Sequence, residues 1–284
     1  MIDSHFHIWR RSEALQKGIL AAGYLQRDFS FEDLAAAAGP ELDAAVEVQV
    51  NDFVDGTVEA RFVAAVRESE RRLAAHIAWA RLESPEVAAE LDALAEIALV
   101  RGVRRTCQVE ADPDVCASRD YIRGARLLGE RAWLCEICVR LAQIRSVPRL
   151  ARAAPETAIV LQHIGKPDLT QPPTAEWLRA VEELGALPNV TCKLSVVVHA
   201  ADDPPYEAER VAPFVRHLVE CFGWRRLLFG SNWPVALAVT GYREWVEMLR
   251  SLLVECGAGP AELEGVFSSN ARRLYRLVQG VSTP

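Results

Sequence analysis

Three histidines have the type and spacing that best suit proton transfer or metal binding. His5 and His7 lie in the apolar run 2–8, and His163 ends the apolar run 158–163. Side chains alternate along a strand, so His5 and His7 point to the same face. We expect that face to be the inner one, because outward imidazoles would be buried against helices. Imidazole exchanges protons near neutral pH and also binds zinc, so both kinds of chemistry are open.

Other polar side chains fall within or at the ends of further apolar runs. They are Glu47, Gln49, Arg104, Glu136, Lys193 and Ser195. A carboxylate buried at position 136 needs a partner, which Arg104 or Lys193 would supply. A purely structural ion-pair network is therefore the alternative to a ligand-binding site.

Eight short apolar runs alternate with segments of helical periodicity. The runs cover 2–8, 44–50, 75–80, 100–107, 132–138, 158–163, 189–195 and 226–230. The helical segments cover 31–38, 57–71, 85–98, 119–130, 141–153, 175–185, 206–221, 242–256 and 260–278. Near-continuous apolar strands separated by helices are typical of a parallel sheet buried on both faces. Eight such units, with no Gly-rich phosphate motif after the first, predict an α/β fold, a single (β/α)8 TIM barrel over residues 1–284.

Composition excludes several classes of protein. The net charge of −7 gives no electrostatic reason to expect a nucleic-acid partner or an anionic membrane. No apolar run reaches the roughly 18 residues that a membrane span needs, and the N-terminus lacks the pattern of a signal peptide. We therefore expect a cytoplasmic protein with free thiols and a small-molecule substrate. A homo-oligomer is compatible with the sequence, which does not decide the oligomeric state.

Several motifs, taken in order, resemble a known family. They are His5-Phe-His7, Gly102-Val-Arg104, Leu161-Gln-His-Ile-Gly-Lys-Pro167, Cys192-Lys-Leu-Ser195, Phe229-Gly-Ser-Asn-Trp-Pro234 and the terminal segment Phe267 to Tyr275. The set resembles the amidohydrolase-2 branch of the amidohydrolase superfamily, alongside sugar-lactone and 2-pyrone-4,6-dicarboxylate lactonases. The resemblance extends over residues 2 to about 278. It implies a distorted (β/α)8 barrel that opens a small carboxylated or sugar-derived lactone with activated water.

The resemblance also implies roles for individual residues. His5, His7 and His163 would surround the carbonyl and the water, and position 232 would supply the general base or a metal ligand. Arg104 would bind a substrate carboxylate, for which its forked guanidinium is suited. The rest of the pocket would be lined by Gln49, Glu136, Lys193, Ser195 and Trp233.

Position 232 departs from the family pattern, because Asn232 replaces the expected aspartate. An amide accepts no proton at neutral pH and is a poor metal ligand. We therefore expect that no cofactor is required, with His5, His7 and His163 as the ligands if a divalent metal such as zinc is bound. Two alternatives stay open: a zinc-dependent hydrolase of an ester or amide, and a catalytically impaired barrel that binds lactones without opening them.

Overall fold

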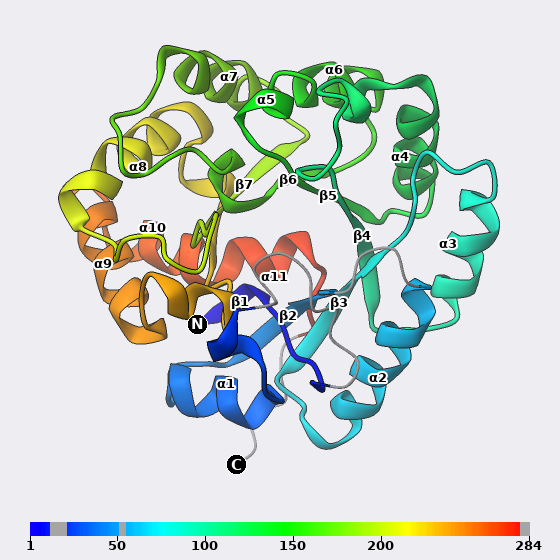
Figure 1. Cartoon of the computed structure of the whole chain (residues 1–284), viewed down its shortest axis with the longest axis horizontal. Helices are drawn as coiled ribbons and strands as arrows, with labels where there is room; N and C mark the ends of the chain where they lie inside the picture. Colours follow the sequence, from blue (N-terminus) through cyan, green and yellow to red (C-terminus); the bar gives the residue numbers. More distant parts are fainter. Residues whose placement is uncertain (12–21, 51–54, 279–284) are drawn as a thin grey trace.

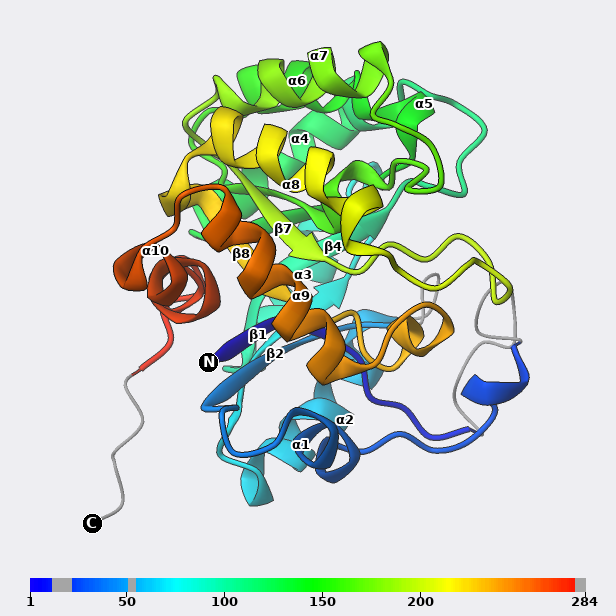
Figure 2. The same cartoon turned by 90° about the vertical axis from the view of Figure 1, so that its left-hand side faces the viewer.

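The structure is a computed structural model that describes residues 1–11, 22–50 and 55–278. Eight parallel strands lie in the order β1 to β8, each paired with the next along the chain. They are β1 Ile2–Phe6, β2 Ala44–Val48, β3 Leu73–Trp79, β4 Val100–Thr106, β5 Leu134–Cys138, β6 Ile159–Leu161, β7 Val190–Ser195 and β8 Leu227–Gly230. Helices surround the strands, as Figure 1 and Figure 2 show. The predicted (β/α)8 barrel is confirmed, and every predicted strand is present.

The helices follow the predicted segments closely. They are α1 Phe31–Ala38, α2 Gly56–Ser69, α3 Val87–Ala95, α4 Arg119–Glu130, α5 Leu141–Ile144, α6 Val147–Ala153, α7 Ala175–Gly185, α8 Ala208–Phe222, α9 Tyr242–Glu255, α10 Pro260–Glu264 and α11 Asn270–Leu274. The segment 141–153, predicted as one helix, is two. Pro148 stands in the first turn of α6, where its missing N–H costs nothing, but it cannot continue a helix from α5.

Alternating strand residues divide the core into two layers. One buried cluster joins Ala44, Val46 and Val48 of β2 to residues of five other strands and to Tyr275, beyond the end of α11. Residues from so many strands can meet only inside the barrel, so this cluster marks the inward positions. The terminal helical segment closes the end of the barrel where the strands begin. A larger cluster fills the space between the outward residues and the surrounding helices.

The seam between β8 and β1 is closed by the segment that follows β8. Asn232 N donates to the His5 carbonyl at 2.7 Å, and His7 N donates to the Trp233 carbonyl at 2.8 Å. Lower in the seam, Ser4 Oγ donates to the Phe229 carbonyl at 2.5 Å. The backbone of the candidate site is therefore part of the barrel closure.

Candidate active site

Three imidazoles meet inside the barrel. The ring centroids of His5 and His7 are 5.0 Å apart, and those of His5 and His163 are 4.5 Å apart. His5 lies in β1 and His7 directly follows it, whereas His163 follows β6, and these strands are not neighbours in the sheet. Their rings can approach this closely only across the interior. The prediction that His5 and His7 point inward is thereby confirmed.

Each imidazole is held differently. His7 Nδ1 donates to the Val48 carbonyl at 2.5 Å, which leaves the lone pair on Nε2. His163 Nδ1 lies 2.9 Å from Ser195 Oγ, and the same hydroxyl accepts the His163 backbone N–H at 3.1 Å. Neither ring nitrogen of the fully buried His5 has a hydrogen-bond partner among the described residues. A buried ring without partners is costly, so His5 is suited to meet a ligand or water.

All three imidazoles are neutral at neutral pH. Burial is the largest cause in each case, because it disfavours the charged ring. Burial, followed by the nearby Arg104 guanidinium, lowers the pKa of His7 to about 3. For His163, burial and then the Lys166 ammonium hold the pKa well below its ordinary range. For His5, burial and then His163 lower the pKa in the same way. Neutral rings keep the lone pairs that a general base needs.

A left-handed turn presents His163. Four consecutive residues, from His163 to Lys166, have φ between 49° and 77°. Only Gly165 adopts this conformation freely, and each of the other three residues costs about 1–2 kcal/mol. The turn is held by the indole N–H of Trp177, which donates to the Ile164 carbonyl at 2.9 Å. Strain of this kind gathers at functional sites, where the surrounding structure enforces it.

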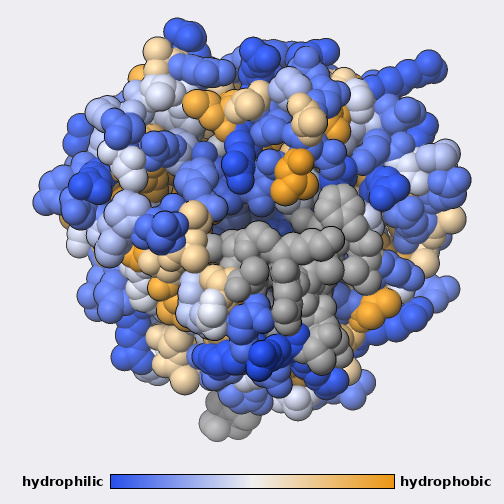
Figure 3. Space-filling view, in the orientation of Figure 1, coloured by the Kyte–Doolittle hydropathy of each residue, from blue (hydrophilic) through white to orange (hydrophobic). Residues whose placement is uncertain are grey.

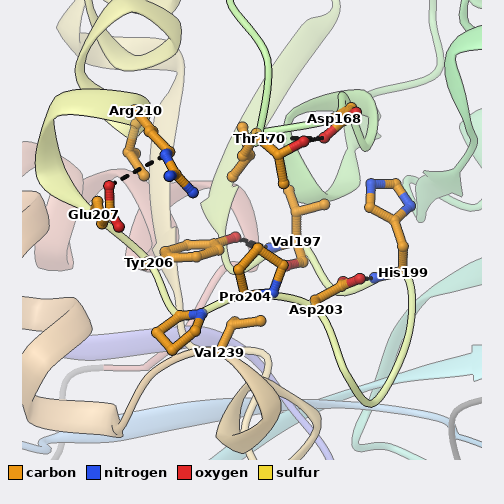
Figure 4. Close-up of a pocket in the computed structure, with 13 residues that line it drawn as sticks. Asp168, Thr170, Val197, His199, Asp203, Pro204, Tyr206, Glu207, Arg210 and Val239 are labelled. Carbon is orange, nitrogen blue, oxygen red and sulfur yellow. Dashed lines mark hydrogen bonds and ion pairs between the residues drawn. The ribbon is translucent and has the colours of Figure 1, made fainter.

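Asn232 also has a left-handed backbone, with φ of 57°. Its Nδ2 donates to the Val196 carbonyl at 2.9 Å, and its side chain acts on the His7 imidazole, whose pKa it raises slightly against the effect of burial. The next residue, Val197, makes two hydrogen bonds with the Tyr206 hydroxyl (Figure 4). The Val197 N–H donates to the phenolic oxygen at 2.6 Å, and the hydroxyl donates to the Val197 carbonyl at 2.9 Å. The segment that receives the Asn232 amide is therefore fixed.

Glu136 and Lys193 are paired with each other beneath the histidines. Lys193 Nζ lies 2.6 Å from Glu136 Oε2 and donates to the Ser4 carbonyl at 2.7 Å. Glu136 also accepts from Gln162 Nε2 and from the Tyr275 hydroxyl, both at 2.6 Å. Both charged side chains are fully buried. These contacts match the structural ion-pair network that the sequence offered as the alternative to a ligand-binding site.

Two other predicted pocket residues lie elsewhere in the wall. Gln49 Oε1 accepts the Trp79 N–H at 2.7 Å, so this side chain extends the pairing of β2 with β3. Trp233 is buried, pairs with Phe6 in an isolated bridge, and packs against Phe29 at 5.3 Å between ring centroids. Both side chains therefore make structural contacts within the barrel, and their predicted contact with substrate stays a prediction.

Glu47 does not share the histidines' face. The inward residues of β2 are Ala44, Val46 and Val48, so Glu47 points outward. There its Oε2 lies 2.5 Å from His76 Nδ1, and both side chains are fully buried. Burial raises the pKa of Glu47 and lowers that of His76 to about 4, so each group favours its neutral form. Glu47 therefore lies outside the site formed by the histidines.

Arg104 and Lys166 bring positive charge to the histidines. Arg104 is inward on β4, and one guanidinium nitrogen donates to the Gln49 carbonyl. Lys166 Nζ donates to Gln108 Oε1 at 2.9 Å. Lys166 lies in the motif Leu161 to Pro167, and no role was predicted for it from the sequence. The signal was its rarity, because the chain has only three lysines and two of them, Lys166 and Lys193, follow or end strands of the barrel.

The described residues do not form a metal centre as they are arranged. No group of three or more His, Cys, Asp and Glu side chains among them is placed to hold a metal ion. The open nitrogens of His5 would suit a metal, but the Glu136 carboxylate is occupied by three donors and position 232 offers an amide.

Comparison with known proteins places the chain in a family. The model of the family described as amidohydrolase matches residues 2–277. The chain belongs to the amidohydrolase family. Among the curated members, an L-fucono-1,5-lactonase from Burkholderia multivorans is 32% identical over 291 residues, covering 97% of this chain and 96% of that protein. A second L-fucono-1,5-lactonase, from Burkholderia ambifaria, is 30% identical and covers 97% and 95% of the two chains.

Solved amidohydrolase structures have the same fold. A Burkholderia multivorans amidohydrolase with bound zinc is 30% identical, with a TM-score of 0.87 over 98% of this chain and 99% of its own. The same protein with bound HEPES gives 28% identity and a TM-score of 0.86, again over 98% and 99% of the two chains. In the described part of this amidohydrolase, no helix is both long and apolar enough to cross a bilayer. The surface seen in Figure 3 is largely hydrophilic and is hollowed near its centre.

Proposed function

We propose that this amidohydrolase opens the ring of a small lactone by hydrolysis, in carbohydrate or aromatic-acid catabolism in the cytoplasm. The observation that carries the proposal is the cluster of three neutral imidazoles inside the barrel, with the Arg104 guanidinium beside them. Two relatives aligned over almost the whole chain are L-fucono-1,5-lactonases, which supports a lactone substrate. The bound zinc of one solved relative favours a metal-dependent hydrolase as the second candidate.

In the proposed mechanism, His163 is the general base. Its Nε2 is free to accept a proton when Nδ1 donates to Ser195 Oγ. The water loses one proton to Nε2 while its oxygen bonds to the lactone carbonyl carbon. The tetrahedral oxyanion is stabilised by the Arg104 charge. When the ring C–O bond breaks, the histidinium returns the proton to the departing alkoxide, so the product is a hydroxy acid.

A lactone screen tests this function. The purified protein is mixed with sugar-derived and carboxylated lactones in weak buffer, and acid release is followed with a pH indicator. We expect release well above the spontaneous rate for at least one lactone, and loss of that release in His163→Asn. Tight binding of lactones with no acid release would contradict the proposal and indicate a silent barrel.

We further expect activity without a bound metal. The reason is the ligand set, which offers imidazoles but no available carboxylate. Metal analysis of the native protein should find well below one equivalent, and prolonged chelation should leave the lactonase rate unchanged. Near-stoichiometric zinc that is lost together with activity, and restored together with it, would contradict this prediction and favour the zinc hydrolase.

A further inference from the structure

Lys166 lies on the same side of the candidate site as the proposed base. His163 and Lys166 are the first and last residues of the left-handed turn. The Lys166 N–H donates to the His163 carbonyl at 2.8 Å. That hydrogen bond holds the two residues close together. The effect of the Lys166 charge on His163, the largest of any charged group, agrees with this placement.

The ammonium of Lys166 is not neutralised by the protein. Its hydrogen-bond partner, Gln108 Oε1, is an uncharged amide that also accepts from the Cys138 thiol at 3.5 Å. Within the described ranges, no carboxylate lies at ion-pair distance from Lys166. The side chain is partly buried. An ammonium has three donors, and holding one away from bulk water without an opposite charge is unfavourable unless a ligand supplies that charge.

Charged groups of both signs act on Lys166. Arg140 and Arg104 act on it as like charges, whereas Cys138 and Asp203 act in the opposite sense. Lys193 is already neutralised by Glu136. Asp203, the acidic side chain that acts on Lys166 from a distance, accepts the His199 N–H at 2.5 Å. The site is thus locally positive in a chain whose net charge is −7, which is the pattern expected around an anionic ligand.

The position of Lys166 separates it from the reacting carbonyl. Its ammonium reaches Gln108, which follows β4. In contrast, His5 lies in β1, His7 directly follows that strand, and Asn232 follows β8. A group bound by Lys166 therefore lies across the barrel mouth from His5, His7 and Asn232. An oxyanion at the scissile carbonyl would need its donor beside the histidines instead.

We propose that Lys166 binds a carboxylate carried by the substrate, so that this site accepts acidic lactones in preference to neutral ones. The inference rests on the proposed lactonase function and narrows its substrate class. It assigns Lys166 a binding role in addition to its effect on the pKa of His163. The strained turn then serves two purposes, because it presents both the base and the cation.

Matched substrates test the proposal. D-glucaro-1,4-lactone carries a free carboxylate, and its 6-amide has the same ring without the charge. Lys166→Gln should raise KM for the acid about 10- to 100-fold, the usual effect of losing a charged hydrogen bond, with kcat little changed. KM for the amide should stay as it is. Lys166→Arg should recover most of the loss, and Arg149→Gln, which removes an exposed cation paired with Asp114, is the control for net charge.

The outcomes are distinct. Equal losses on both substrates, mainly in kcat, would overturn the proposal and make Lys166 a stabiliser of the transition state. Unchanged kinetics on both would also overturn it. If native protein opens no lactone, the proposed function fails, but binding of D-glucarate by calorimetry still tests Lys166. A tenfold or greater weakening in Lys166→Gln, recovered in Lys166→Arg, would support the anion site, and an unchanged affinity would refute it.

Discussion

Replacing His163 with asparagine should lower kcat by about 10²–10⁴-fold, whereas Asn232→Asp should give no gain. The first variant keeps a polar side chain but removes the nitrogen that accepts the proton. The second introduces a carboxylate where the structure uses an amide donor. Asn232 Nδ2 donates to the Val196 carbonyl at 2.9 Å, and a carboxylate oxygen in that place would face the carbonyl oxygen. The amide at 232 therefore makes a hydrogen bond that a carboxylate could not make.

Steady-state kinetics on an accepted lactone measure both effects. Ser195→Ala is the companion variant, because loss of the hydroxyl beside His163 Nδ1 should lower kcat without removing the base. A circular dichroism spectrum and melting temperature matching the native protein would confirm that each variant is folded. A gain of about a hundredfold or more in Asn232→Asp would contradict the assignment, since it would show that the site lacks a carboxylate base.

The pH dependence should reflect the environment of His163. Its pKa is held well below the ordinary histidine value by burial and then by the Lys166 charge. The ring is neutral and active above its own pKa, so kcat/KM should persist as pH falls through 6.5 and decline only in more acidic solution. A bound carboxylate would neutralise Lys166, raise the pKa of His163 and make it a stronger base. For an acidic lactone, the decline in kcat should therefore begin at higher pH than the decline in kcat/KM.

The barrel could be predicted because parallel strands that are buried on both faces have near-continuous apolar sequences. Each of the eight apolar runs is a strand, and α1, α4 and α7 have the predicted bounds. The inward direction of His5 and His7 followed from alternation and the cost of burying imidazoles outside the barrel. The ends of the strands were predicted less accurately. For example, β6 ends at Leu161, two residues before its predicted end, and the left-handed turn begins at His163.

Other features of the site could not be read from the sequence. Glu47 and His5 both lie in apolar strands, yet they face opposite ways because β1 and β2 shift register between Asp3 and Phe6. The left-handed backbone at His163 and Asn232 is imposed by tertiary contacts against local preference. The pairing of Glu136 with Lys193, and not with Arg104, depends on the geometry of the interior. From the sequence alone, Arg104 and Lys193 were equally plausible partners of Glu136.

Breaking the Glu136–Lys193 pair should be the most destabilising single change in the interior. Glu136→Gln leaves the Lys193 ammonium fully buried without an opposite charge, and it also weakens the acceptor of the Tyr275 hydroxyl. Removal of one partner of a buried pair typically costs about 3–5 kcal/mol. Urea unfolding should show a free energy of unfolding lower by that amount. Asp114→Asn, which breaks an exposed pair with Arg149, should cost at most about 1 kcal/mol.

The same variant separates a structural role from a binding role. Lys193 donates to the Ser4 carbonyl on β1, and Glu136 holds Tyr275 beyond α11, so the pair joins β1 to the closed end of the barrel. If the pair is structural, the folded fraction of Glu136→Gln should keep a near-native KM at low temperature. The double variant Glu136→Leu with Lys193→Met should recover part of the lost stability, since it leaves no uncompensated charge. A large rise in KM with native stability would instead make Glu136 a ligand-binding residue, as the sequence first indicated.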